Sequence, residues 1–310
     1  MAPVFDGWLF LLILTAIVIG WLLGYYRRST SKPQSQRVSS QRYYKGLNYL
    51  LNDEADGAID AFLSALEVNS ETIEMHLALG GLLRRRGESG RAIRIHQNLM
   101  SRSSLSKEQR QQVQYELAQD YMKFGWLDRA ERLLLDLNRE SPAGRGQVLS
   151  SLITIYQQEQ EWQEALAAVK EFALAKNGKG CAATLAAGAH FCCELAEGFL
   201  QTKDCRSARR ALKEALQLDK NCVRASLLSG ELELTTGHPK FALKALKRIA
   251  QQDMERVPDS VPQLTHAFAA IGEPQGIVNH LERCCAEQQS SALVCCLYEQ
   301  LKEHRGVEHA

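Results

Sequence analysis

The sequence predicts an all-α protein in which one N-terminal transmembrane helix precedes an array of helical hairpins. Residues 7–26 contain no charged side chain, and as a helix they are long enough to cross a hydrocarbon core of about 30 Å. Small residues recur in pairs twelve positions apart, and these pairs repeat at intervals of 34 to 43 residues. Apolar residues follow three-and-four spacing on both sides of short breaks, which is typical of two antiparallel helices.

The uncharged run is predicted to be a retained membrane anchor. A cleaved signal peptide would have an early Lys or Arg, a shorter apolar run and small residues at its end, whereas here aromatic side chains lie near both ends of the run. Aromatic rings at these places favour the lipid headgroup layer, and the basic residues that follow place the body in the cytoplasm. The anchor spans residues 1–28, and its expected interfacial residues are Trp8, Trp21, Tyr25, Tyr26, Arg27 and Arg28.

Residues 29–42 are basic, rich in Ser and Gln, and lack apolar periodicity. They are predicted to form a solvated tether close to anionic lipid. The formal charge of the whole chain is +1, so that residues 43–310 carry a net charge of −3. A nucleic-acid-binding body would be basic, and nucleic acid is therefore not an expected partner.

Residues 43–310 are predicted to be the repeat array. Six clear repeats lie between Tyr43 and about Gln252, followed by a degenerate seventh and an incomplete eighth. Gly87, Gly125 and Gly237 each follow the first small residue of a repeat by seven positions, where a left-handed residue is expected to end the first helix. The residues expected at helix crossings are Gly46, Ala58, Gly80, Ala92, Ala118, Ala130, Ala165, Ala196, Ala208, Gly230 and Ala242.

The pattern resembles the tetratricopeptide repeat, which implies a right-handed α-solenoid. The first repeat matches its small and bulky positions with Gly46, Tyr49, Ala58, Phe62 and Ala65. The final apolar stretch, 291–301, supplies a first helix without a second and lacks a polar cap. We therefore expect further sequence beyond it.

Four stretches, "RGESGRAIRIHQNLM", "DYMKFGWLDRAE", "AHFCCELA" and "DKNCVRASLLSG", together resemble the bacterial lipopolysaccharide assembly protein B family. The resemblance implies a single-pass protein of the inner membrane whose body faces the cytoplasm. The resemblance also implies an adaptor function. The protein would present the committed-step lipid A deacetylase to a membrane-bound ATP-dependent protease, under the control of an inner-membrane regulator. Family members end in a rubredoxin-like metal domain with two C-x-x-C knuckles, a motif that this sequence lacks, so no cofactor is expected in this chain.

The second repeat carries the candidate partner-binding residues Arg84, Arg85, Arg91 and Arg94. Guanidinium groups in a groove could bind partner carboxylates bidentately. The alternatives are a solvated face, ion pairs to Glu88 or Glu116 within the array, or stabilisation of a helix C-terminus. His96 occupies the position of an aromatic core residue, which favours a packed, hydrogen-bonded imidazole over a catalytic base.

No phosphate loop, nucleophile elbow, zinc-protease motif or dinucleotide fingerprint occurs in the sequence, and an enzyme is not expected. The nine cysteines are expected to be mostly small buried side chains of a reducing compartment. The alternative function is a membrane-tethered co-chaperone, or an assembly scaffold for an envelope complex, that binds peptide tails. Homo-oligomerisation is compatible with either function.

Overall fold

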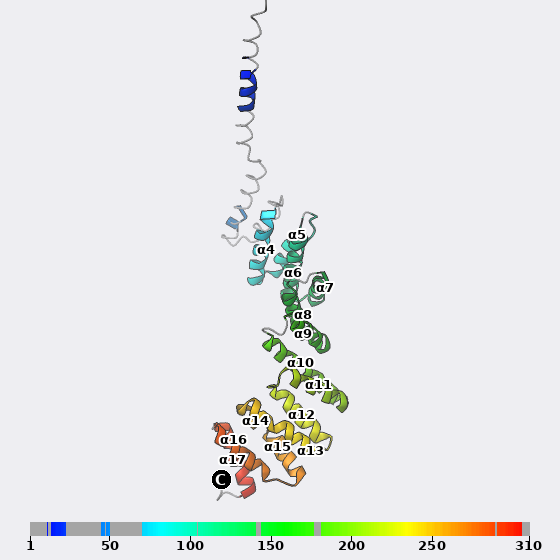
Figure 1. Ribbon diagram of the computed structural model, residues 1–310, viewed down its shortest axis with the longest axis vertical. Helices are drawn as coiled ribbons and strands as arrows, with labels where there is room; N and C mark the ends of the chain where they lie inside the picture. The colour runs from blue at the N-terminus through cyan, green and yellow to red at the C-terminus, as the bar shows by residue number, and fades with distance from the viewer. Residues whose placement is uncertain are drawn as a thin grey trace, which may run out of the picture. The chain divides into compact units, whose positions relative to one another are not determined.

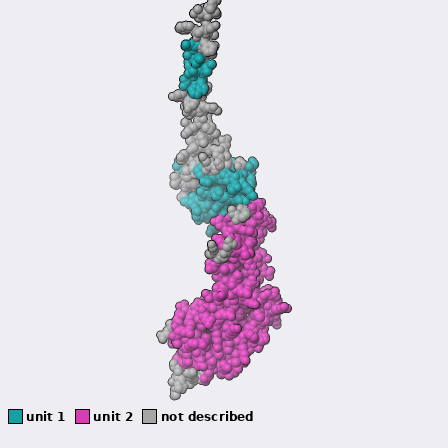
Figure 2. All heavy atoms as spheres, viewed as in Figure 1, with its two compact units in different colours: residues 1–126 teal, residues 127–310 magenta. Residues whose placement is uncertain are grey.

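The structure is a computed structural model in which two compact units divide the chain, unit 1 at residues 1–126 and unit 2 at residues 127–310 (Figure 2). The residues that it describes are 11, 14–22, 45, 46, 48, 49, 70–103, 105–140, 144–176, 181–288 and 290–305.

All regular elements within the described ranges are helices, which confirms the all-α prediction for this part of the chain. The helices of unit 1 from residue 70 onward are α4 (Ser70–Arg85), α5 (Ser89–Met100) and α6 (Lys107–Phe124). Those of unit 2 are α7 (Leu127–Glu140), α8 (Arg145–Glu159), α9 (Trp162–Ala175), α10 (Ala182–Gln201), α11 (Cys205–Leu218), α12 (Val223–Thr235), α13 (Pro239–Lys247), α14 (Ile249–Gln252), the 3₁₀ helix η1 (Met254–Arg256), α15 (Val257–Ile271), α16 (Gly276–Glu287) and α17 (Ser291–Arg305).

Within each unit, helices that are consecutive in the chain pack against one another (Figure 1). In unit 1, α5 contacts both α4 and α6. In unit 2, α8 packs on α9, α10 on α11 and α12 on α13, and α10 also contacts α9 and α12. Each helix therefore buries its apolar stripe partly within its own hairpin and partly against the next one.

Small side chains lie where helix axes approach closely. Gly46 is buried and Ala58 lies outside the described residues. A Cβ atom on Gly80 would lie 2.3 Å from Nε2 of His96, and one on Gly230 would lie 2.5 Å from Cδ2 of Leu246, although atoms in contact normally stay about 3.5 to 4 Å apart. The predicted crossing alanines within the described residues have no exposed surface, and they are Ala92, Ala118, Ala130, Ala165, Ala196, Ala208 and Ala242.

Left-handed residues end the first helices of the second to sixth repeats. Gly87, Gly125 and Gly237 have φ angles of 86°, 90° and 79°, which confirms their expected conformation. Gln160 and Lys203 take the same conformation, with φ angles of 60° and 61°, although neither is a glycine. At all five positions the next residue's N–H bonds back to a carbonyl five residues earlier, which is the Schellman arrangement.

Gln160→Gly and Lys203→Gly are each expected to raise the free energy of unfolding by about 0.5 to 1 kcal/mol. A Cβ atom makes this conformation cost about 1 to 2 kcal/mol, and the greater freedom of glycine in the unfolded chain cancels part of the gain. Thermal unfolding of the two variants measures the effect. Gly237→Ala is the control and should shift the melting temperature downward. A lower melting temperature for both glycine variants would contradict the strain argument.

Part of the predicted anchor lies within the described residues. Residues 14–22 are helical, and their large apolar side chains, including Trp21 at 68%, are exposed. Among the described residues, no helix combines the length and the apolar character needed to span a bilayer. The predicted anchor residues Trp8, Tyr25, Tyr26, Arg27 and Arg28, and the tether at 29–42, lie outside the described residues.

Candidate partner-binding site

The arginine-rich hairpin of unit 1 contains one guanidinium group that joins two helices. Arg84, in the last turn of α4, places Nη1 2.7 Å from Oδ1 of Asp120 and Nη2 2.7 Å from Oε2 of Glu116, both on α6. The Asp120 side chain is fully buried, whereas Arg84 and Glu116 keep 20% and 25% of their side-chain surface exposed. Burial lowers the pKa of Arg84, but the hydrogen bonds and charges of the two carboxylates raise it by more. Arg84 therefore forms ion pairs with Glu116 and Asp120 within the array, which was the alternative to contact with a partner protein.

The carboxylate of Asp120 also accepts a hydrogen bond from His96. The Nδ1 atom of this fully buried ring on α5 lies 2.5 Å from Oδ2 of Asp120. Because a carboxylate can only accept, Nδ1–H is the donor. Nε2 packs over Gly80 and has no hydrogen-bond partner among the described residues. His96 is thus a packed and oriented imidazole with no route to a substrate in solvent.

The remaining candidate arginines differ in whether they form an ion pair. Arg91 pairs with Glu88 three residues earlier. Arg85 and Arg94 are exposed, and neither takes part in an ion pair within the described ranges. Of the four candidates, these two guanidinium groups are the ones that present their charge to solvent.

Two exposed aromatic rings lie at the end of α6, which packs on α5, the helix that carries Arg94. Phe124 and Trp126, at the end of α6, are 48% and 40% exposed, with ring centroids 4.6 Å apart in an edge-to-face arrangement. Trp126 also lies 5.7 Å from Tyr121, so its ring packs on the end of α6 and stays partly exposed. Phe124 approaches Gly90 in the first turn of α5, one helical turn before Arg94. We call Arg85, Arg94, Phe124 and Trp126 the arginine–aromatic surface.

Sequence reasoning missed Phe124. A large apolar residue directly before a helix-ending glycine, on a helix whose other exposed positions are polar, was the signal that could have identified it. The exposed fraction of Trp126 shows that packing leaves part of its indole ring open to solvent.

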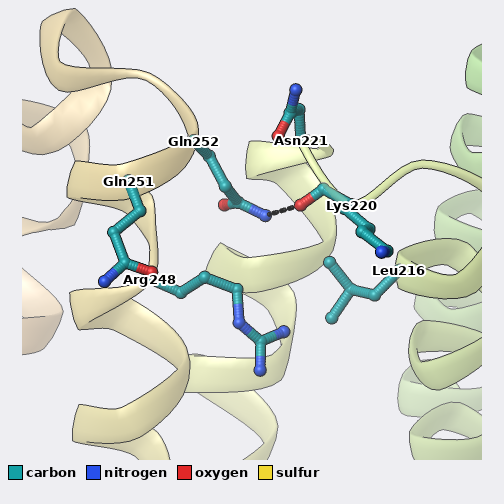
Figure 3. Close-up of a pocket in the computed structure, with 6 residues that line it drawn as sticks. All are labelled: Leu216, Lys220, Asn221, Arg248, Gln251 and Gln252. Carbon is teal, nitrogen blue, oxygen red and sulfur yellow. Dashed lines mark hydrogen bonds between the residues drawn. The ribbon is translucent and has the colours of Figure 1, made fainter.

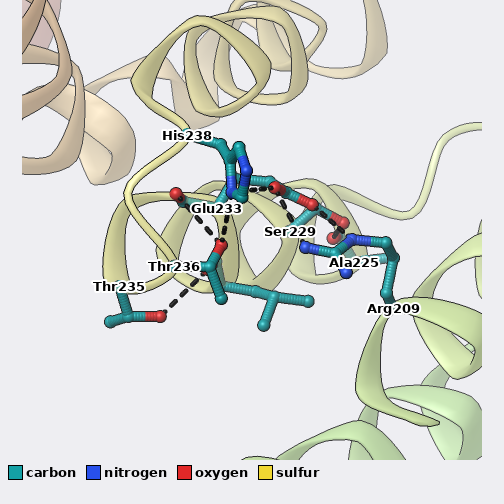
Figure 4. Close-up of polar contacts among 8 residues, drawn as sticks. Arg209, Ala225, Ser229, Glu233, Thr235, Thr236 and His238 are labelled. Carbon is teal, nitrogen blue, oxygen red and sulfur yellow. Dashed lines mark hydrogen bonds and ion pairs between the residues drawn. The ribbon is translucent and has the colours of Figure 1, made fainter. Parts of the chain in front are cut away.

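In unit 2, long-range arginine pairs join neighbouring helices. Arg209 on α11 donates Nε and Nη2 to the two oxygens of Glu233 on α12, at 2.7 and 3.1 Å. Nδ1 of His238 lies 3.7 Å from the same carboxylate, next to the end of α12 (Figure 4). The hydrogen bonds to Glu233 raise the pKa of Arg209. These charges hold helices in register.

A polar pocket of about 390 Å³ lies between the α11–α12 connection and α14 in unit 2 (Figure 3). Nε2 of Gln252 donates to the main-chain oxygen of Lys220 across it, at 2.6 Å. The lining contains two cations and no carboxylate, so it could accept a small acidic group. The lining residues are Leu216, Lys220, Asn221, Arg248, Gln251 and Gln252.

The described residues contain no cluster of three or more His, Cys, Asp or Glu side chains suited to a metal ion. Their polar groups can make hydrogen bonds and ion pairs with a partner, and the exposed aromatic rings can add apolar contact. The arginine–aromatic surface thus presents both charged and apolar side chains to solvent.

No protein-family model matches the chain. It is 35% identical over 302 residues to lipopolysaccharide assembly protein B of Escherichia coli (strain K12), an alignment that covers 97% of this chain and 76% of that protein. It is 34% identical over 276 residues to the Haemophilus influenzae protein of the same name, covering 86% and 67%. A tetratricopeptide repeat protein from Parabacteroides merdae superposes with a TM-score of 0.42 and 14% identity, over 77% of this chain and 89% of that one. The resemblance predicted from the sequence motifs is confirmed, and the chain belongs to the lipopolysaccharide assembly protein B family.

Proposed function

We propose that this protein is a membrane-anchored, non-enzymatic adaptor in lipopolysaccharide assembly. The observation that carries the proposal is 35% identity across 97% of the chain to a protein named for that process. Two features support it. The uncharged run at residues 7–26 suits a single-pass anchor in the bacterial inner membrane, and the arginine–aromatic surface suits a protein partner.

The expected partners are the committed-step lipid A deacetylase and a membrane-bound ATP-dependent protease. The adaptor presents the first protein to the second and so limits lipopolysaccharide synthesis, under control of an inner-membrane regulator. A tethered body of this kind works by proximity. The anchor keeps it within a few nanometres of the membrane, which raises the effective concentration of membrane-bound partners without new contacts.

The arginine–aromatic surface has the chemistry to bind an acidic segment of such a partner. Arg85 and Arg94 can each bind a carboxylate through two parallel N–H···O bonds. Phe124 and Trp126 can bury apolar area beside these charges, and Arg and Trp are enriched among the residues that dominate binding energy. The neighbouring Arg84–Asp120–His96 contacts keep α4, α5 and α6 in place, so binding needs little reordering.

Charge reversal of the exposed arginines tests this surface. The double variant Arg85→Glu and Arg94→Glu is expected to capture at least about tenfold less deacetylase or protease than the unchanged chain, since two favourable contacts become repulsive. Capture is measured with the purified full-length protein in a quantitative pull-down. The melting temperature should stay the same, because both side chains are exposed.

The matched control is the double variant Arg206→Glu and Arg210→Glu on α11, which reverses two exposed arginines of unit 2. It should capture partners as the unchanged chain does. Equal capture by the Arg85/Arg94 variant would remove the arginine–aromatic surface from the proposal. Tight binding of short acidic-ended peptides, without capture of either folded partner, would favour the peptide-binding co-chaperone instead.

A further inference from the structure

Two thiols from different hairpins face each other inside unit 2. Cys193 lies in the middle of α10, and Cys222 immediately precedes α12. Their Sγ atoms are 4.0 Å apart although 29 residues separate them in the chain. Both are free thiols, with 0% and 3% of their surface exposed. No C-x-x-C motif marks this pair in the sequence.

Two ion pairs made by one arginine near the thiols join the two helices. Arg224 on α12 places Nη1 2.7 Å from Glu194 and Nη2 2.7 Å from Glu197, both on α10. Glu194 is the neighbour of Cys193, and Arg224 follows Cys222 by two positions. A disulfide bond is about 2.05 Å long, so the sulfur atoms must approach by about 2 Å. Side-chain rotation can supply this approach while the helices stay in contact.

The local chemistry distinguishes the two thiols. The pKa of Cys222 is lowered because the Cys193 S–H donates to it and because the Ala225 N–H, in the first turn of α12, also points at its sulfur, while burial opposes both effects. The pKa of Cys193 is raised by the same hydrogen bond and by burial. Cys222 is also the N-cap residue of α12, and a helix N-terminus favours the thiolate, which is the reactive form. Cys193 stays protonated beside it.

We propose that Cys193 and Cys222 are a redox modification site, which hydrogen peroxide or a related hydroperoxide converts to a reversible disulfide between α10 and α12. This modification goes beyond adaptor function and does not depend on it. The two residues come from the first helices of consecutive repeats, and the cross-link encloses the whole of α11. Oxidation would therefore join two neighbouring hairpins covalently.

The reaction balances in two steps. The Cys222 thiolate attacks one oxygen of the peroxide, the O–O bond breaks, and the departing hydroxide takes a proton to become water. The Cys193 sulfur then attacks the sulfur of the resulting sulfenic acid, an S–S bond forms, the S–O bond breaks, and the Cys193 proton leaves with a second water. Two thiols lose two electrons and one peroxide gains them. A dithiol reductant reverses the change by thiol–disulfide exchange.

The test uses the reduced full-length protein, treated with a graded excess of hydrogen peroxide, alkylated and mapped by peptide mass spectrometry. We expect a linked Cys193–Cys222 peptide pair, lighter by two hydrogens and restored by dithiothreitol. Amide hydrogen exchange of α10 and α12 should slow in the oxidised protein. Cys192→Ser, which removes the adjacent buried thiol, is the matched control and should leave the linkage intact.

Cys193→Ser supplies a second readout that does not require a disulfide. In this variant the Cys222 sulfenic acid has no resolving thiol and should be trapped by dimedone. The proposal is overturned if Cys222 is fully alkylated, without a linkage to Cys193, at peroxide concentrations that already oxidise the exposed Cys295. A dominant linkage that joins Cys222 to Cys192 would overturn it as well.

Discussion

Asp120→Ala is expected to destabilise unit 1 by about 3 kcal/mol, because removing one partner of a buried ion pair leaves the other partners without compensation. Asp120 has no exposed side-chain surface and receives hydrogen bonds from both Arg84 and His96. Without it, the buried Nδ1–H of His96 loses its acceptor, and Arg84 keeps only Glu116. Local unfolding is measured by amide hydrogen exchange of α4, α5 and α6, since stacked repeats need not unfold as one cooperative unit.

Glu88→Ala provides the matched control for Asp120. It removes a carboxylate from another arginine pair of the same hairpin, but the side chains of Glu88 and Arg91 are 28% and 31% exposed. Such a pair contributes about 0 to 1 kcal/mol. Similar exchange rates in the Asp120→Ala and Glu88→Ala variants would show that the buried network contributes no more than a surface ion pair.

Gly80→Ala is expected to lower the free energy of unfolding by about 2 kcal/mol. The added methyl group would lie 2.3 Å from Nε2 and 2.4 Å from Cε1 of His96. The ring cannot move away without breaking its contact with Asp120, so the site is overfilled at a cost of about 1 to 3 kcal/mol. This cost exceeds the gain of up to about 1 kcal/mol that alanine offers over glycine in a helix. Thermal unfolding and exchange of the α5 amides report the loss.

A glycine-to-alanine substitution at Gly198 should instead raise the free energy of unfolding. Gly198, in α10, has no atom within 4 Å of the position of an added Cβ. Gly198→Ala is therefore expected to stabilise the protein by about 0.5 to 1 kcal/mol through helix propensity alone. A melting temperature that rises equally in the Gly80 and Gly198 variants would contradict the close packing of α4 on α5.

Much of the helical architecture could be predicted from residue spacing. Apolar periodicity and paired small residues depend on local geometry, because side chains three and four positions apart share one face of a helix. The left-handed residues show how far this reasoning extends. The seven-residue offset that identified Gly87 also leads to Gln160 and Lys203. Neither is a glycine, so the residue type did not indicate a left-handed conformation at these two positions. Backbone hydrogen bonding imposes the conformation there, whatever the side chain.

The candidate site was harder to predict, because ion pairs are chosen by packing between segments far apart in the chain. Four of the five arginines at positions 84–94 were candidates in the sequence. The position of α6 against α4 pairs Arg84 with Asp120, 36 residues later, and leaves Arg85 at the surface. The exposed fractions of Phe124 and Trp126 likewise depend on which surfaces the neighbouring helices cover.

By itself, the sequence determined the family, the helical class, the glycines that end helices and the small residues at helix crossings. These properties follow from backbone sterics and from the fixed periodicity of the helix, which act within one or two turns. Only the tertiary structure decided which charged groups are paired, which aromatic rings stay exposed and which thiols meet. Such contacts join residues about thirty positions apart, and their free energies depend on distances and burial that no local pattern contains.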